Sequence, residues 1–263
     1  MANRTTLVGA ALLLVACGAD PGDDLDDEKT STTTAALDVG ASAASLDGLD
    51  AADPAKAAAH LAASTKESCK TRTVDPANPN IVHVTLDACG GRFDRHVVSG
   101  HLTVTFSANA DGSLHAETVS EDLTIDGRAF SRKVSEDIRF DGDQRTVTRH
   151  SEKTGTKKNG DSLEQSQDAV IVFDRATRCR TENGTGRALV AGSREIAMTT
   201  ADLRTCEADD GQEYCPTGTI EHVNKAKGKT RTVTFDGTTV ATIEVSKRKG
   251  DTSSTWTLAC VAR

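Results

Sequence analysis

Regularly spaced turn dipeptides constrain the fold of this chain more than any other feature. Asp-Gly pairs stand at residues 111–112, 126–127 and 141–142, 15 residues apart, and similar Asp-Gly or Asn-Gly pairs follow at 159–160, 183–184, 210–211 and 236–237. Such pairs are the strongest short-range hairpin signal because type I′ turns need positive φ at both central residues. The spacing therefore predicts strands of about thirteen residues joined in an antiparallel meander.

The turns also predict which residues face each other across the strands. If Asp126-Gly127 is a two-residue turn, Ile125 faces Arg128 and Val119 faces Val134; the same rule at 111–112 places Val104 opposite Val119. One face then collects Val104, Phe106, Val119, Leu123, Ile125, Phe130, Val134, Ile138, Phe140 and Val147. The other face is polar, and a slip of one residue would invert both sets.

Two cross-strand charge pairs support this register. Glu121 is expected opposite Arg132, and a loop at 141–144 places Glu136 opposite Arg149, so both pairs have opposite signs, as strand pairing prefers. Strands this long with one apolar face must curve to cover that face. The predicted fold is therefore all-β: a long-stranded antiparallel meander forming a strongly curved sheet or open half-barrel.

A second meander is expected toward the C-terminus, with strands near 218–224, 230–236, 239–246 and 254–260. Val233 and Phe235 share a face with Val240, whereas Ile243 falls on the other face, which predicts a β-bulge. The run at 170–173 (VIVF) is apolar on both faces and predicts a central strand.

The chain begins with one cation, Arg4, and a short apolar segment, 7–16, which has the length of a signal peptide rather than of a membrane span. The last residues, Leu14-Val15-Ala16-Cys17, resemble the lipobox of bacterial lipoprotein precursors. The resemblance implies that residues 1–16 are a signal peptide and that Cys17 carries the lipid anchor. Since Gly18 rather than Asp follows the cysteine, it also favours the outer membrane of a bacterial envelope, with the domain periplasmic or surface-exposed.

Negative charge is concentrated just after Cys17. Residues 18–53 hold ten acids and one base, Lys29, a net charge of −9, whereas residues 54–263 hold 29 acids and 29 bases. With no aromatic residue, residues 17–66 are predicted to be an extended tether, interrupted by a short helix at 54–63 that begins at an Asp53 N-cap. That helix is expected to be a spacer rather than a lid. Residues 67–263 form the single predicted β domain.

Six further cysteines follow Cys17: Cys69, Cys89, Cys179, Cys206, Cys215 and Cys260. An even number in an exported chain implies three disulfides, with fifteen connectivities open. We expect Cys69–Cys89, Cys179–Cys206 and Cys215–Cys260. No CxxC motif points to redox chemistry or zinc binding.

Catalytic and metal-binding patterns are weak. A cluster within eight residues (Asp94, His96, Ser99 and His101) suggests a hydrolase, but it lacks a nucleophile-elbow motif and its histidines point to opposite faces of a strand. Other histidines are scattered, at His83, His115, His150 and His222. We therefore predict no enzyme activity, no catalytic residues, no metal, no cofactor and no nucleic-acid partner.

The leading functional prediction is a non-enzymatic, lipid-anchored envelope lipoprotein whose β domain is structural, adhesive or engaged in protein contact. Its expected partners are the membrane, through the anchor, and envelope proteins. The alternative is a carrier of a lipid or other apolar ligand, bound in the half-barrel by Val104, Val119, Phe130 and Val134. A hydrolase of unknown substrate is the third hypothesis.

Overall fold

The protein is described from a computed structural model that covers residues 53–63, 69–90, 97–157, 160–192, 194–207, 214–247, 250–258 and 260–262. The predicted signal peptide, Cys17, the acidic tether up to residue 52, and both Asp94 and His96 lie outside these described residues.

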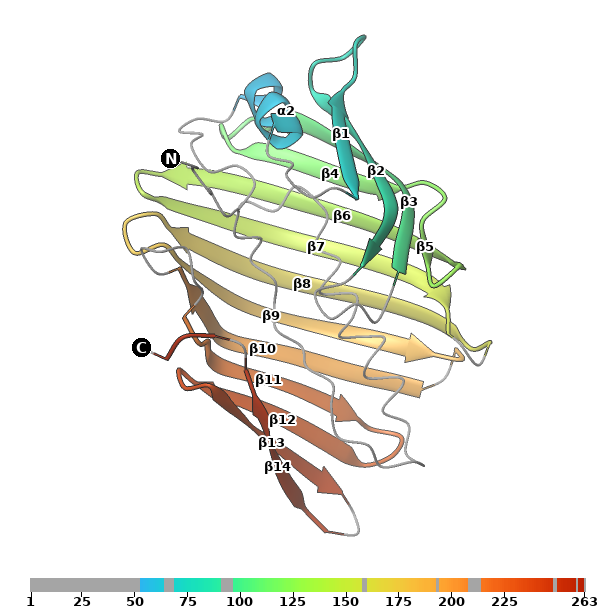
Figure 1. The fold of residues 1–263 in the computed structure, drawn as a ribbon, viewed down its shortest axis with the longest axis vertical. Coiled ribbons are helices and arrows are strands. Elements are labelled where there is room, and N and C mark those ends of the chain that lie inside the picture. The colour runs from blue at the N-terminus through green and yellow to red at the C-terminus, as the bar shows by residue number, and fades with distance from the viewer. Residues whose placement is uncertain are drawn as a thin grey trace, which may run out of the picture.

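Within the described residues, one helix precedes a long series of strands (Figure 1). The elements are α2 (Pro54–Ala63), β1 (Lys70–Val74), β2 (Ile81–Gly90), β3 (Val97–Ala108), β4 (Leu114–Ser120), β5 (Thr124–Ile125), β6 (Arg128–Asp141), β7 (Gln144–Thr156), β8 (Ser162–Asp174), β9 (Cys179–Val190), β10 (Arg194–Cys206), β11 (Thr217–Asn224), β12 (Lys229–Asp236), β13 (Val240–Lys247) and β14 (Thr252–Thr257).

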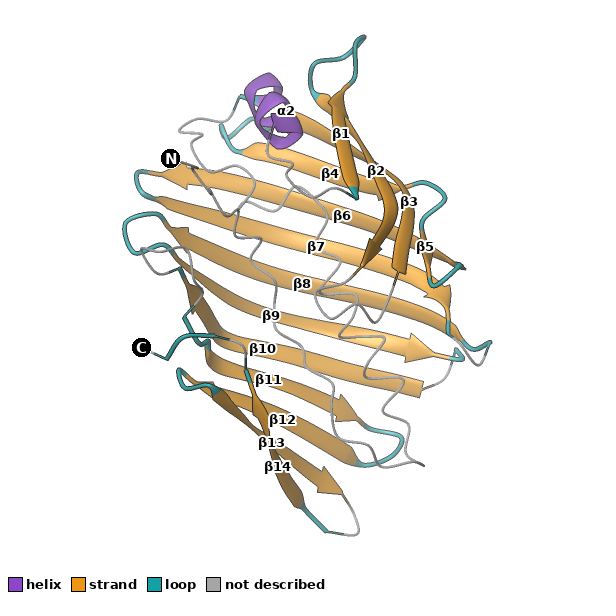
Figure 2. Ribbon diagram, viewed as in Figure 1, coloured by secondary structure: helices purple, strands orange, loops and turns teal. Residues whose placement is uncertain are grey.

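The strands form a single 14-stranded antiparallel sheet in which neighbours in sequence are neighbours in space (Figure 2). The short β5 is the one departure from this order, since it pairs with β3 and β6. The sheet stays open, with β1 and β14 at its two edges, and its first strands curl forward over one face. This confirms the predicted all-β meander, including its long strands: β6 has 14 residues and β7 has 13.

The register is as predicted between β6 and β7 and at the start of the turn at 126–127, but β4 is shifted by one residue on both of its sides, so that Val119 pairs with Lys133 and not with Val134. Ile125 pairs with Arg128, and Glu136 pairs with Arg149. Val104, however, pairs with Thr118 instead of Val119. The cause is the loop at 109–113, where Asp111 accepts hydrogen bonds from both the backbone N–H and the hydroxyl of Ser113 and so holds five residues out of the ladder.

That one-residue difference moves two predicted residues. Val119 lies on the outer face, 39% exposed. Glu121 is not opposite Arg132: the backbone N–H of Arg132 donates to the Ser120 hydroxyl at 2.7 Å, and the partner of Arg132 on β7 is Lys153. The predicted Glu121–Arg132 pair was therefore wrong, because the end of β4 departs from regular pairing before β5 begins.

The C-terminal meander has its four predicted strands, but no bulge is recorded between β12 and β13. A three-residue connection at 237–239 places Ile243 directly opposite Val233, so both are buried on the same face while Val240 is 40% exposed. Irregularity occurs instead between Ala201 and Arg204 of β10. The predicted central strand is β8, although its Val170 is 45% exposed and only one of its faces is covered.

We call the face that carries the buried side chains the inner face. A first apolar core occupies its N-terminal end and includes Phe106, Ile138, Val147 and Ile171. A second lies at its C-terminal end, around Ile220, Val233, Phe235 and Trp256.

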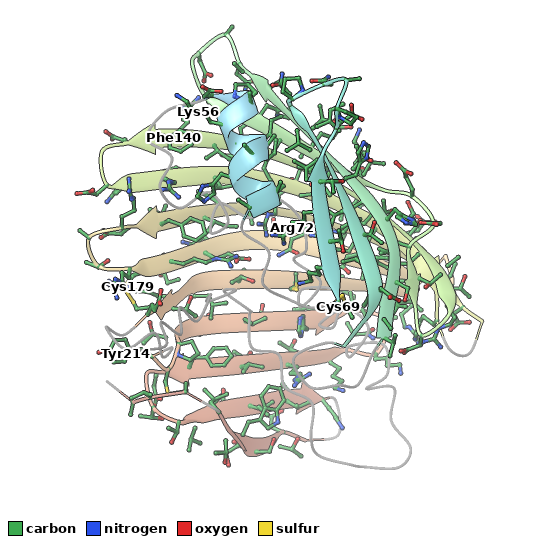
Figure 3. All side chains as sticks on the ribbon, turned by 45° about the horizontal axis from the view of Figure 1, so that its top comes forward. Lys56, Cys69, Arg72, Phe140, Cys179 and Tyr214 are labelled. Atoms are coloured by element: carbon green, nitrogen blue, oxygen red, sulfur yellow. A yellow bond between two sulfur atoms is a disulfide. The ribbon has the colours of Figure 1, made fainter. Side chains whose placement is uncertain are left out.

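Helix α2 belongs to the first core. Asp53 caps it by accepting a hydrogen bond from the Lys56 backbone N–H at 3.0 Å, as predicted. Its Ala57, Ala58 and Leu61 are fully buried in that core, so the helix covers the inner face and is not a free spacer. Figure 3 shows Arg72 of β1 below the helix, where its guanidinium donates to the Leu61 carbonyl at 3.4 Å.

All three expected disulfides are formed. Cys69–Cys89 joins the start of β1 to the end of β2, and Cys179–Cys206 links directly opposed ends of β9 and β10. Cys215–Cys260 links the residues just before β11 to the C-terminal segment. The Cα atoms are 5.1 Å apart in Cys69–Cys89, 4.0 Å in Cys179–Cys206 and 4.9 Å in Cys215–Cys260.

Candidate functional site

Charged side chains interrupt the apolar inner face on β6 to β12, on strands that also carry residues of both apolar cores and of a third, smaller apolar cluster (Leu163, Ala188, Val190 and Ile196). From Phe130 of β6 to Phe235 of β12, alternation and register place eight basic and two acidic residues on this face, a net charge of 8 − 2 = +6. We call this set the charged centre: Arg132, Arg145, Arg149, Lys153, Arg180, Arg194, Lys229 and Arg231, with Glu136 and Glu182. Because residues 54–263 are neutral overall, the rest of them carries −6.

Two basic residues face each other directly in the charged centre. Arg132 and Lys153 are register partners on β6 and β7, and each is only 5% exposed. Like charges directly opposed across strands destabilise the pair, and buried charges are tolerated when ionic partners compensate them. The register therefore concentrates two buried cations at one point of the inner face.

The same surface already binds carboxylates of the protein itself. Arg149 Nε donates to Glu136 Oε1 at 2.7 Å, the pair predicted from the register, with the Glu136 side chain 2% exposed. Arg180 Nη2 donates to Glu182 Oε2 at 2.5 Å, two residues along β9, and both side chains are buried. Guanidinium–carboxylate recognition is thus the chemistry that this face displays.

Aromatic rings separate the cations at one margin of the charged centre. Phe140, Arg145, Phe173 and Arg180 follow one another in register across β6 to β9. The Arg145 guanidinium lies 5.7 Å from the Phe140 ring centre, and that of Arg180 lies 5.6 Å from Phe173. Figure 3 places Phe140 at the edge where these strands turn. The rings fix the guanidiniums by cation–π contact without neutralising them.

The charged centre extends to the second core. There the Arg231 guanidinium lies 4.8 Å from the Trp256 ring centre. Between β6 and β12 there are six steps between strands, or roughly 29 Å at the usual strand spacing. The charged centre is therefore elongated across the sheet.

The outer face carries histidines in cross-strand pairs with aspartates. His83 pairs with Asp75 at 2.8 Å, and His101 Nδ1 lies 2.9 Å from Asp122. His115 and His150 are paired in the same way, at 2.8 Å from Asp137 and 2.7 Å from Asp168.

In the His115–Asp137 and His150–Asp168 pairs, the hydrogen bond shifts the pKa of one member. The hydrogen bond from His115, followed by that from Asn109, lowers the pKa of Asp137. The hydrogen bond to Asp168 raises the pKa of His150. No group of three or more His, Cys, Asp or Glu side chains suited to a metal ion occurs within the described ranges.

The residues predicted to bind an apolar ligand do not form one surface. Val104 and Val134 are buried on the inner face, and Phe130 packs there over Gly155. Val119 lies on the opposite face. Since three of the four are sealed in packed positions and the fourth faces outward, they do not line an open apolar cavity.

The two described members of the predicted hydrolase cluster, Ser99 and His101, each have a hydrogen-bond partner elsewhere in the chain. The Ser99 hydroxyl accepts a hydrogen bond from the Ala88 backbone N–H at 3.1 Å, and His101 is engaged by Asp122. His222 is buried on the inner face of β11, far along the sheet from β3. The described residues of this cluster thus have structural partners of their own.

Sequence reasoning missed the charged centre, although its signal was present. Arg132 and Glu136 have the same parity as Phe130, Val134 and Ile138, so the alternation that found the apolar face also assigned them to it. They were missed because charged residues are expected to face solvent.

Comparison with protein-family models, with curated proteins and with solved structures gave no match to this chain. Within the described residues, no helix is long and apolar enough to cross a membrane.

Proposed function

We propose that the protein is a lipid-anchored lipoprotein of the bacterial envelope, tethered through Cys17, whose β domain binds an acidic polypeptide on its inner face. The observation that carries the binding role is the charged centre: eight basic and two acidic residues on the inner face of β6 to β12. No catalytic role is part of the proposal.

The chemistry of the charged centre supports carboxylates as the recognised groups. Arg149 and Arg180 each bind a carboxylate in this face. Buried charges of one sign do not add stability over an apolar core of similar volume, so their accumulation here points to binding. The apolar-carrier alternative has less support because Val119 does not share a face with Val104.

The binding test uses poly-L-glutamate as the probe, with titration calorimetry on the purified protein. We expect saturable binding that weakens at high salt, since exposed parts of such an interface are screened. Lys153→Gln should weaken the Kd about tenfold, the value of one charge-assisted hydrogen bond of roughly 1.4 kcal/mol. Lys133→Gln, on the outer face of the neighbouring strand, is the matched control and should leave the Kd unchanged. Equal effects of the two variants would overturn the assignment to the inner face.

The anchor is tested separately by feeding expressing cells a clickable fatty acid. The wild-type protein should incorporate the label and sediment with membranes. Cys17→Ser should lose both properties. A labelled Cys17→Ser protein would refute the lipobox assignment while leaving the binding proposal intact.

A further inference from the structure

We infer that the chain's own acidic segment, residues 18–52, docks on the charged centre and competes there with external acidic polypeptides. The inference rests on the proposed function for its regulatory meaning, because a segment bound within the chain lowers the apparent affinity for any other occupant. Three features support the docking: the opposite charges of the segment and the charged centre, the length of the segment, and the position at which it joins the domain.

The charges are complementary in sign and similar in number. Residues 18–52 contain nine acids and one base, a net charge of 1 − 9 = −8. The charged centre carries +6. Six of the nine acids lie between residues 20 and 28, which makes this part of the segment the densest run of acids in the chain. Complementary potentials of this kind select the orientation and partner of a contact.

The segment joins the domain on the correct face. It leads directly into Asp53, the N-cap of α2, and the buried side of α2 packs in the first apolar core on the inner face. In Figure 1 the helix lies over the uppermost strands of the sheet, near β1 and β4. The segment therefore begins from the side of the sheet where the basic residues lie.

The segment is long enough to cover the whole charged centre. Its 35 residues (18–52) would span roughly 115 Å when extended, several times the distance of roughly 29 Å between β6 and β12. The acids at 20–28 can therefore reach Arg132 and Lys153 on β6 and β7 or Arg231 on β12. Since the segment lacks aromatic residues, salt-sensitive ion pairing rather than apolar burial would hold it.

The experiment is zero-length carbodiimide cross-linking of the purified protein, followed by mass spectrometry of the monomer band. A mixture of isotopically light and heavy chains identifies links within one molecule. Docking predicts intramolecular links from the acids at 20–28 to Lys153, at least tenfold more abundant than links to Lys133 or Lys225. High salt should abolish them. Exposure alone predicts the reverse order, because the side chains of Lys133 and Lys225 are 54% and 72% exposed while Lys153 is 5% exposed.

A charge-neutral segment provides the matched variant. Replacing Asp23, Asp24, Asp26 and Asp27 by Asn and Glu28 by Gln leaves the domain untouched. With docking, this variant should bind poly-L-glutamate about tenfold more tightly than the wild type. The same number of substitutions at outer-face acids should not tighten binding.

The outcomes separate this inference from the proposed function. Links to Lys153 that poly-L-glutamate displaces support both. If excess poly-L-glutamate does not displace the links to Lys153, and the charge-neutral variant does not bind the probe, the segment docks on the charged centre. The proposed binding of an external acidic polypeptide is then overturned. If poly-L-glutamate binds but the abundance of cross-links follows the exposure of the lysines, the docking of residues 18–52 is overturned and the proposed function stands.

Discussion

The first and last strands of the sheet differ from its central strands, β6 to β12, in the side chains that they place on the inner face. At the ends, inward residues are aliphatic or aromatic, as with Val104 and Phe106 of β3 in the first core and Ile243 of β13 and Trp256 of β14 in the second. In the centre, the same alternation places Arg132 and Lys153 inward. Strand periodicity therefore fixes which side chains point inward, but it does not fix whether that face is a core or a binding surface.

The difference also separates stability from function. Apolar burial stabilises the ends at roughly 25 cal/mol for each Å² removed from water. Burying charge in the centre has a desolvation cost that ion pairing only offsets. The ends are thus expected to hold the fold, and the centre to be retained for what it binds.

The largest expected effect is at the first core. Phe106→Ala removes a ring that is 1% exposed and should lower the free energy of unfolding by about 3–5 kcal/mol, through lost burial and the cavity left behind. Urea unfolding followed by circular dichroism measures it. Thr105→Ala, the next residue on the exposed face, is the control and should change stability by no more than about 0.5 kcal/mol. Comparable losses in the two variants would mean that this end of the face is not the stabilising core.

A buried ion pair tests the opposite rule in the centre. Arg180→Met leaves the Glu182 carboxylate buried without its guanidinium and should cost about 3 kcal/mol. The double variant Arg180→Met/Glu182→Leu should recover most of that loss, because a well-packed apolar pair of similar volume replaces the ionic one. Urea midpoints of the two single variants and the double variant complete the thermodynamic cycle.

If the double variant remained as unstable as Arg180→Met, the ion pair itself would stabilise the sheet. The contrast between core ends and binding centre would then fail for β9. Recovery of stability together with weaker poly-L-glutamate binding would establish that the charged centre serves binding rather than stability.

Much of this fold is readable from the sequence because local rules and the global pattern agree. The Asp126-Gly127 turn, the Glu136–Arg149 pair, the Asp53 cap and all three disulfides follow from the residues themselves. The pairing of Val104 did not follow, because the Ser113 contacts of Asp111 enlarge a loop that the dipeptide rule treats as two residues.

Only part of the charged centre could be recognised from sequence, for a different physical reason. Parity assigned Arg132 and Glu136 to the inner face, but the net charge of that face depends on which strands lie beside β6 and β7. The role of α2 was equally hidden, since an Ala-rich helix of ten residues shows its packing partner only once the first strands curl over the sheet.

A smaller effect is expected where the first core meets the charged centre. A Cβ on Gly155 would lie 2.7 Å from the Phe130 ring, so Gly155→Ala forces the ring aside and should cost about 1–2 kcal/mol. Thermal or urea unfolding measures the loss, with Thr154→Ala on the exposed face of the same strand as control. Adding Phe130→Leu to Gly155→Ala should restore part of the stability if the ring is the obstacle. No restoration would show that Gly155 is needed for its backbone instead.

The smallest effect is expected on the outer face, where ion pairs are exposed. Asp168 raises the pKa of His150, so the folded state binds the His150 proton more tightly than the unfolded chain does. The added stability is therefore full below about pH 6.5 and is lost as the pH rises through the raised value, and it should stay below about 1 kcal/mol because the pair is solvent-exposed. An NMR titration of the His150 ring in the wild type and in Asp168→Asn measures the shift directly. A pKa that does not fall in Asp168→Asn would show that outer-face pairs add no stability, and the contrast in electrostatics would then belong to the inner face alone.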